Sequence, residues 1–95
     1  MAREKTRSSD LVIMNPEDNV AVSLREIKAG EELEATYKNS FLRIITKDHI
    51  PLGHKVSLTR IKKDEPIVKY GEIIGRAKKE ISLGQHVHIH NVCDF

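Results

Sequence analysis

The sequence predicts a small, mainly β domain, and three observations point to this fold class. Apolar and polar residues alternate along several short segments, which is the period of a half-buried strand. A motif suited to tight turns recurs four times between those segments. The chain has 95 residues, of which 39% are hydrophobic, so it can bury one core and has no room for a second domain.

Alternation predicts about seven short strands. The clearest run covers residues 32–37, where Leu33, Ala35 and Tyr37 share one face and polar residues share the other. The next residues, 38–40, can form a turn that returns the chain as a partner strand. The strands that can be placed, in chain order, cover residues 20–24, 32–37, 41–46, 55–59, 66–70 and 86–91.

One segment allows two interpretations. Residues 73–83 place Ile73, Ala77 and Ile81 at helical spacing, so this segment could form an amphipathic helix instead of a strand. Gly75 in its interior disfavours the helix, because glycine costs about 1 kcal/mol relative to alanine there.

The turn motif has an isoleucine, then Gly or Asp three residues later, then an aliphatic residue after three more. Glycine adopts positive φ freely, and aspartate tolerates it better than most residues. Each copy therefore predicts a single helical turn that ends in a left-handed residue and leads into a strand. Unequal intervals between the copies argue against a solenoid. The copies are Ile27–Leu33, Ile50–Val56, Ile61–Ile67 and Ile81–Val87.

The excess positive charge is confined to the start of the chain. Residues 1–9 hold three basic and one acidic side chain, which accounts for the whole formal charge of +2. We therefore expect residues 1–10 to be a disordered polar tail and residues 11–95 to be the folded domain. A neutral domain with two Tyr, two Phe and no Trp argues against nucleic-acid binding.

Signals for export or membrane insertion are missing from the sequence. No apolar run approaches the roughly 18 residues of a membrane span, and the first residues lack the apolar stretch of a secretory signal. The single cysteine, Cys93, excludes an internal disulfide. We expect a cytoplasmic protein that does not contact a membrane.

Histidines near the carboxyl end carry the most unusual chemistry. On a strand, His86, His88 and His90 share one face, while Val87 and Ile89 face the core. Neighbouring same-face residues lie about 6.7 Å apart, so two adjacent imidazoles can bind one metal and all three cannot. A third ligand would come from elsewhere, such as His54 or another chain. The alternative is a solvated histidine face without a ligand.

Two lysines follow tight turns and could bind an anionic substrate. Lys55 comes directly after Gly53-His54, and Lys69 precedes Tyr70-Gly71. An ammonium group offers a point charge and three hydrogen-bond donors. The alternative is that both are solvated lysines at strand ends. No glycine-rich phosphate loop, nucleophile elbow or pair of carboxylates at catalytic spacing occurs, and no base can be paired with Cys93.

Four segments in the same order resemble one family. They are residues 15–22 (NPEDNVAV), 50–56 (IPLGHKV), 67–77 (IVKYGEIIGRA) and 84–91 (GQHVHIHN). Together they are similar to the amino-terminal SAF domain of the altronate and galactarate dehydratases, which also occurs as a separate small subunit. The resemblance covers about residues 11–92 and implies a β-clip fold, a single compact β domain with hairpins and short helical turns.

The resemblance also implies a reaction. Family members dehydrate sugar acids such as altronate or galactarate, and a relative is the small subunit of sulfolactate sulfo-lyase. It implies a divalent metal, Fe²⁺ or Mn²⁺, with His86, His88 and His90 as its candidate ligands, and it does not separate metal ligands from substrate contacts among the histidines. It further implies that the substrate is bound by His54, Lys55, Lys69 and Tyr70. It does not identify the general base.

The chain departs from the fused dehydratases because it stops at Phe95. Ninety-five residues of a thin β domain cannot enclose a sugar acid, a metal and a base. We therefore expect a separate large subunit as the partner and an inactive isolated chain. The alternatives are a SAF module that binds carbohydrate or protein without catalysis, and a lid that shapes the partner's pocket.

Overall fold

The computed structural model describes residues 10–93, and most of the expected polar tail lies outside these residues. Within the described part the chain forms nine strands and no helix, which confirms the mainly β fold class. No helix in residues 10–93 is therefore long and apolar enough to cross a membrane. The strands are β1 (Leu11–Val12), β2 (Val20–Ser23), β3 (Glu32–Tyr37), β4 (Ser40–Ile45), β5 (Lys55–Ser57), β6 (Pro66–Lys69), β7 (Glu72–Ala77), β8 (His86–Val87) and β9 (Val92–Cys93).

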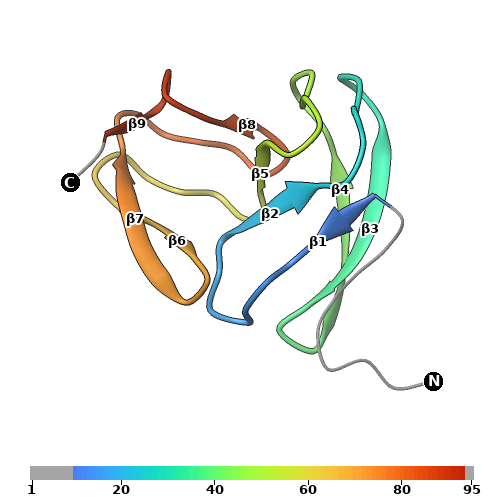
Figure 1. Ribbon diagram of the computed structural model, residues 1–95, viewed down its shortest axis with the longest axis horizontal. Coiled ribbons are helices and arrows are strands. Elements are labelled where there is room, and N and C mark those ends of the chain that lie inside the picture. Colours follow the sequence, from blue (N-terminus) through green and yellow to red (C-terminus); the bar gives the residue numbers. More distant parts are fainter. Residues whose placement is uncertain (1–9, 94–95) are drawn as a thin grey trace.

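The strands form a small central sheet with a hairpin on each side (Figure 1). The central sheet has the order β1-β2-β5-β8, and every pairing in it is antiparallel. Strands β3 and β4 make one hairpin, and β6, β7 and β9 make a three-stranded sheet. Two apolar clusters fill the interior, one around Ile44 and Val56 and the other around Ile67 and Val87.

The turn motifs build the corners of the fold. Each has positive φ at its Gly or Asp and a backbone hydrogen bond across four residues, as in a type II β-turn. The predicted left-handed residue is therefore confirmed, but each predicted helical turn is a β-turn. A single such bond closes the corner before the chain enters the next strand. The left-handed residues are Gly30, Gly53, Asp64 and Gly84.

The isoleucines that open the four motifs pair with one another across the fold. Ile27 bridges Ile50 at the base of the β3–β4 hairpin, and Ile61 bridges Ile81 at the base of the β6–β7 hairpin. All four are at most 1% exposed. The repeated motif thus marks an internal duplication, in which each half is one hairpin closed by a buried isoleucine pair.

The described residues exclude one alternative that the sequence disfavoured, and they correct one predicted strand. The alternative helix over 73–83 is absent, because β7 covers Glu72–Ala77 and pairs with β9. A Cβ on Gly75 would lie 2.6 Å from the carbonyl oxygen of Cys93, so glycine at this position allows the close strand approach.

The correction concerns the predicted strand over residues 86–91. Strand β8 ends at Val87, and residues 88–91 form a turn. Val87 is buried as expected, but Ile89 is 74% exposed instead of facing the core. The cause is Asn91, whose buried amide bonds the backbone of both His86 and His88 and folds the chain back.

Candidate metal and substrate site

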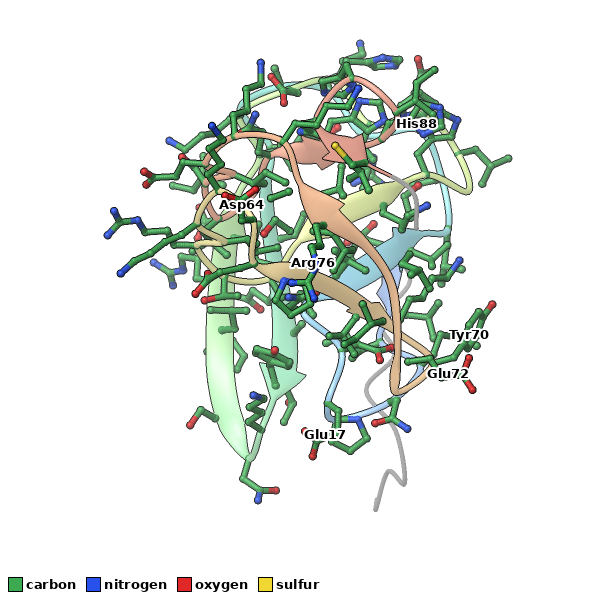
Figure 2. The ribbon with its side chains drawn as sticks, turned by 90° about the vertical axis from the view of Figure 1, so that its left-hand side faces the viewer. Glu17, Asp64, Tyr70, Glu72, Arg76 and His88 are labelled. Carbon is green, nitrogen blue, oxygen red and sulfur yellow. The ribbon has the colours of Figure 1, made fainter. Side chains whose placement is uncertain are left out.

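Three imidazoles meet at one end of the central sheet. The ligand nitrogens of His54, His86 and His88 all lie within 4.8 Å of one another, and we call these residues the histidine cluster. The Nδ1 of His54 is 2.9 Å from the Nε2 of His86, and the rings of His54 and His88 are stacked with centroids 4.4 Å apart. Figure 2 shows His88 near this end of the molecule.

The turn after β8 brings His88 back beside His86. On a straight strand these two side chains would be about 6.7 Å apart, whereas their ring centroids lie 5.4 Å apart here. The backbone N–H of His86 also donates to the Oδ2 of Asp48 (3.0 Å), from the loop after β4. A loop distant in sequence therefore fixes the start of the segment that carries both imidazoles.

The side chain of His54 can join the cluster because its own β-turn does not engage it in a hydrogen bond. In three of the four turn motifs, the side chain of the fourth turn residue accepts a hydrogen bond from the backbone N–H of the first. In the remaining turn the first residue is Pro51, which has no N–H, and the fourth is His54. The other three pairs are Lys28 with Glu31 (2.7 Å), Lys62 with Glu65 (2.7 Å) and Ser82 with Gln85 (2.9 Å).

The surroundings favour the neutral form of two of these imidazoles, His86 and His54. Burial, followed by the neighbouring His90, His54 and His88, lowers the pKa of His86 to about 4. Burial and next His88 also lower the pKa of His54. A neutral imidazole has a free lone pair, so the cluster holds nitrogen donors ready for a cation near neutral pH.

The histidine cluster differs from the predicted set of metal ligands, which was His86, His88 and His90. His90 is exposed, and its ring lies 5.2 Å from that of His86, but it is outside the group whose ligand nitrogens converge. His54, which the resemblance assigns to the substrate, takes the third place. His49 is also exposed and instead contacts Glu26 at 2.6 Å.

Lys55 lies next to the cluster on β5 and pairs with Val87 of β8. Its side chain is half-buried, and burial followed by the charge of Lys69 lowers the pKa of Lys55. The two ammonium groups are therefore close enough for the charge of Lys69 to disfavour a charge on Lys55. The Nζ of Lys69 in turn lies 4.9 Å from the ring centroid of Tyr70, and Figure 2 shows Tyr70 well below His88 in that view.

Asp18 holds the turn that presents Lys69 and Tyr70, and sequence reasoning did not single it out. Its carboxylate is fully buried and accepts hydrogen bonds from the N–H of Tyr70 (3.0 Å) and of Gly71 (2.8 Å). These two hydrogen bonds stabilise the positive φ angles of the turn, which are 58° at Tyr70 and 72° at Gly71. The signals in the sequence are its place in the segment 15–22 that carries the family resemblance and the preceding Asn15-Pro16 pair, which indicates a turn.

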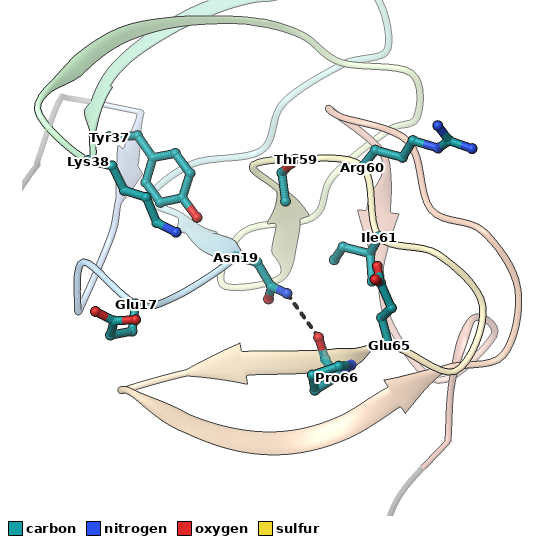
Figure 3. A pocket seen from close by; sticks show the side chains of 9 residues that line it. All are labelled: Glu17, Asn19, Tyr37, Lys38, Thr59, Arg60, Ile61, Glu65 and Pro66. Atoms are coloured by element: carbon teal, nitrogen blue, oxygen red, sulfur yellow. Dashed lines mark hydrogen bonds between the residues drawn. The ribbon is translucent and has the colours of Figure 1, made fainter.

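A separate cleft of about 450 Å³ opens between the two hairpins. Figure 3 shows Tyr37 and Lys38 on one side of it and Pro66 on the other. None of the predicted site residues lines this cleft, and the amide of Asn19 in it already bonds the carbonyl oxygen of Pro66 at 2.9 Å. The histidine cluster and the two lysines therefore lie outside this cleft.

Comparison with known proteins identifies the family. Residues 9–94 match the family described as the altronate/galactarate dehydratase SAF domain. The chain is 47% identical over 78 residues to altronate dehydratase of Bacillus subtilis, covering 82% of this chain but 15% of that protein. It is 38% identical over 88 residues to the (2R)-sulfolactate sulfo-lyase subunit alpha of Chromohalobacter salexigens, covering 90% of this chain and 94% of that one.

A third relative has a different named substrate. The chain is 33% identical over 87 residues to the galactarate dehydratase (L-threo-forming) of Escherichia coli, covering 90% of this chain and 15% of that enzyme. The chain thus spans a small part of the dehydratases and nearly all of the sulfo-lyase subunit. It belongs to the SAF-domain family of the altronate and galactarate dehydratases.

Proposed function

We propose that this chain is the SAF component of a metal-dependent hydroxy-acid lyase, in which the histidine cluster binds a divalent cation. The observation that carries the proposal is the convergence of His54, His86 and His88, with ligand nitrogens within 4.8 Å of one another. Three imidazoles gathered without carboxylate partners need a reason, since a surface histidine gains nothing from two others beside it.

The geometry and chemistry of the cluster fit a metal ion. Two imidazole nitrogens on one ion, with bonds of about 2.1 Å, lie about 3.4 Å apart at a tetrahedral angle. The nitrogens here lie from 2.9 Å for the closest pair to at most 4.8 Å, so small ring rotations suffice. Three protein ligands leave coordination positions for a substrate, as in catalytic sites. Imidazole suits Fe²⁺ and other first-row ions, and Fe²⁺ or Mn²⁺ is the ion we propose.

Lys55 and Lys69 give the site its attraction for an anion. A hydroxy acid carries a carboxylate, which an ammonium group binds by charge and hydrogen bonding. Burial first, and the charge of Lys69 second, lower the pKa of Lys55, and an anion beside both ammonium groups would relieve their repulsion. Tyr70, whose ring lies beside Lys69, adds a phenol next to that ammonium group. We therefore assign these three residues to substrate binding.

The reaction we propose is elimination from a sugar acid such as altronate or galactarate. When bound, the metal would stabilise the negative charge that develops on the substrate as a proton is removed beside its carboxylate. The neutral imidazoles hold that ion without adding charge of their own, and the lysines orient the carboxylate. Sulfolactate is the second candidate, because the chain spans 94% of a sulfo-lyase subunit.

The remaining catalytic groups are proposed to come from a large polypeptide. The chain corresponds to 15% of the altronate dehydratase that it resembles. Its histidines and lysines lie on the surface and not in an enclosed cavity, so they cannot exclude water from a reacting substrate. The partner would close this surface and supply the general base.

Metal content tests the proposal. We expect the purified chain to bind one Mn²⁺ or Fe²⁺ per molecule, and the triple variant His54→Ala, His86→Ala, His88→Ala to bind none. His49→Ala is the matched control, since His49 contacts Glu26 and lies outside the cluster. The complex with the large polypeptide is then assayed with altronate, galactarate and sulfolactate. A triple variant that keeps full metal content and turnover would instead indicate a lid without ligands.

A further inference from the structure

Asn91 is a buried polar residue that the proposed chemistry does not use. Its side chain is fully buried, and both ends of its amide contact the histidine segment. The Oδ1 accepts from the N–H of His88 at 2.9 Å, and the Nδ2 donates to the carbonyl oxygen of His86 at 2.8 Å. Its own N–H donates to the carbonyl oxygen of His88 (3.0 Å), and its carbonyl accepts from Lys78 (2.9 Å).

These bonds decide where the imidazoles lie. The Oδ1 contact replaces the ladder partner that the N–H of His88 would have in a continuing strand, so the chain turns after Val87. Asp48 fixes the preceding residue through the N–H of His86. Asp48 is not in the group of converging ligand atoms, and both polar atoms of the Asn91 amide are already bonded to the backbone, so we assign neither as a ligand.

We propose that Asn91, together with Asp48, is the positioning residue of the histidine cluster. It folds residues 86–91 so that His88 returns beside His86 and faces His54. This inference rests on the proposed metal function, since its consequence is metal affinity. Removal of groups that orient metal ligands typically costs 10- to 100-fold in affinity.

The molecule contains a matched control. Asn19 makes the same pair of contacts at a site distant from the histidines, accepting from the N–H of Val68 (2.8 Å) and donating to the carbonyl oxygen of Pro66 (2.9 Å). Asn19→Ala therefore releases the same two kinds of backbone group as Asn91→Ala. A loss of metal affinity in a folded Asn91→Ala that is absent from Asn19→Ala is the result that the positioning role predicts.

The experiment titrates the full chain with Co²⁺ and follows the visible d–d absorption. Wild type is expected to bind one ion, Asn91→Ala to bind at least tenfold more weakly with an altered spectrum, and Asn19→Ala to bind within twofold of wild type. Equal affinity in wild type and Asn91→Ala, or an equal loss in both Asn variants, would overturn the positioning role. Absence of binding in wild type would overturn the metal function instead.

Two further measurements decide the case if Asn91→Ala unfolds or the wild type binds no metal. Asp48 is half-buried in a loop, so Asp48→Ala should remain folded, and Asp48→Asn keeps an acceptor for the N–H of His86. We expect weaker Co²⁺ binding in the first and recovery in the second. Without metal, NMR should show contacts between the His54 and His88 rings in wild type and Asp48→Asn and their loss in Asp48→Ala. Ring contacts that persist in Asp48→Ala would contradict the proposal.

Discussion

Replacement of Asp18 offers a quantitative test of how the fold supports the lysine surface. Asp18→Ala removes the acceptor of two hydrogen bonds, from the N–H groups of Tyr70 and Gly71. A hydrogen bond to a charged group contributes about 1.5–3 kcal/mol, and we take the lower value because both donor residues are exposed. The expected loss in the free energy of unfolding is about 3 kcal/mol, a large fraction of the 5–15 kcal/mol of an ordinary domain.

Urea denaturation measures this loss. For a chain of this size the midpoint should fall by about 1–3 M, since the denaturant slope is typically 1–3 kcal/mol per M. Asp18→Asn keeps one acceptor oxygen and should lose about half as much. Glu17→Ala is the control, because its carboxylate is exposed and should matter by less than about 0.5 kcal/mol. Asp18→Ala and Glu17→Ala with equal midpoints would refute the reasoning.

Three further predictions follow from other sites. Gly84→Ala should destabilise the domain far more than Gly30→Ala: both have positive φ, costing roughly 1–2 kcal/mol, but only a Cβ at residue 84 would lie 2.4 Å from the carbonyl oxygen of Ile45. Thermal unfolding of the two variants compares them directly, and equal melting temperatures would contradict the close contact. In the metal-free chain, the free energy of unfolding should decrease as the pH falls from about 6.5 to 4, because the unfolded state binds a proton at His86 before the folded state does. His86→Ala should flatten this pH dependence. An unchanged slope in that variant would contradict the prediction. In the reconstituted enzyme, Lys55→Gln should raise the KM for the acid substrate by about tenfold, as expected for loss of a charged contact of roughly 1.4 kcal/mol, whereas Lys47→Gln, at an exposed loop position, should not change it.

Local patterns explain which parts of the fold could be predicted. The alternation over residues 32–37 reports burial on one face directly, and β3 has the predicted bounds, Glu32–Tyr37. The left-handed positions were predictable because Gly and Asp are the residues that tolerate them, and Gly30, Gly53, Asp64 and Gly84 all have positive φ.

Contacts between distant segments explain the failures. Alternation from His86 to Asn91 looks like a strand, but a side-chain amide outcompetes the strand ladder for the N–H of His88. Asp18 bonds residues more than 50 positions away, and no local pattern reports such a contact.

The histidine cluster was predictable only in part. Adjacent imidazoles at His86 and His88 follow from the sequence, and His54 was one candidate for a third. Its selection depends on the pairing of β5 with β8 and on Pro51, which leaves the His54 side chain unused by its own turn. The exclusion of His90 depends on the turn that the sequence pattern concealed.

X-ray absorption of the Fe²⁺-loaded complex tests the central claim most directly, because imidazole rings around a metal give a distinctive scattering pattern. The account predicts three histidine nitrogens bound to iron, reduced to two by His54→Ala and unchanged by His49→Ala. Iron bound to oxygen ligands alone, or a spectrum that His54→Ala does not alter, would contradict it.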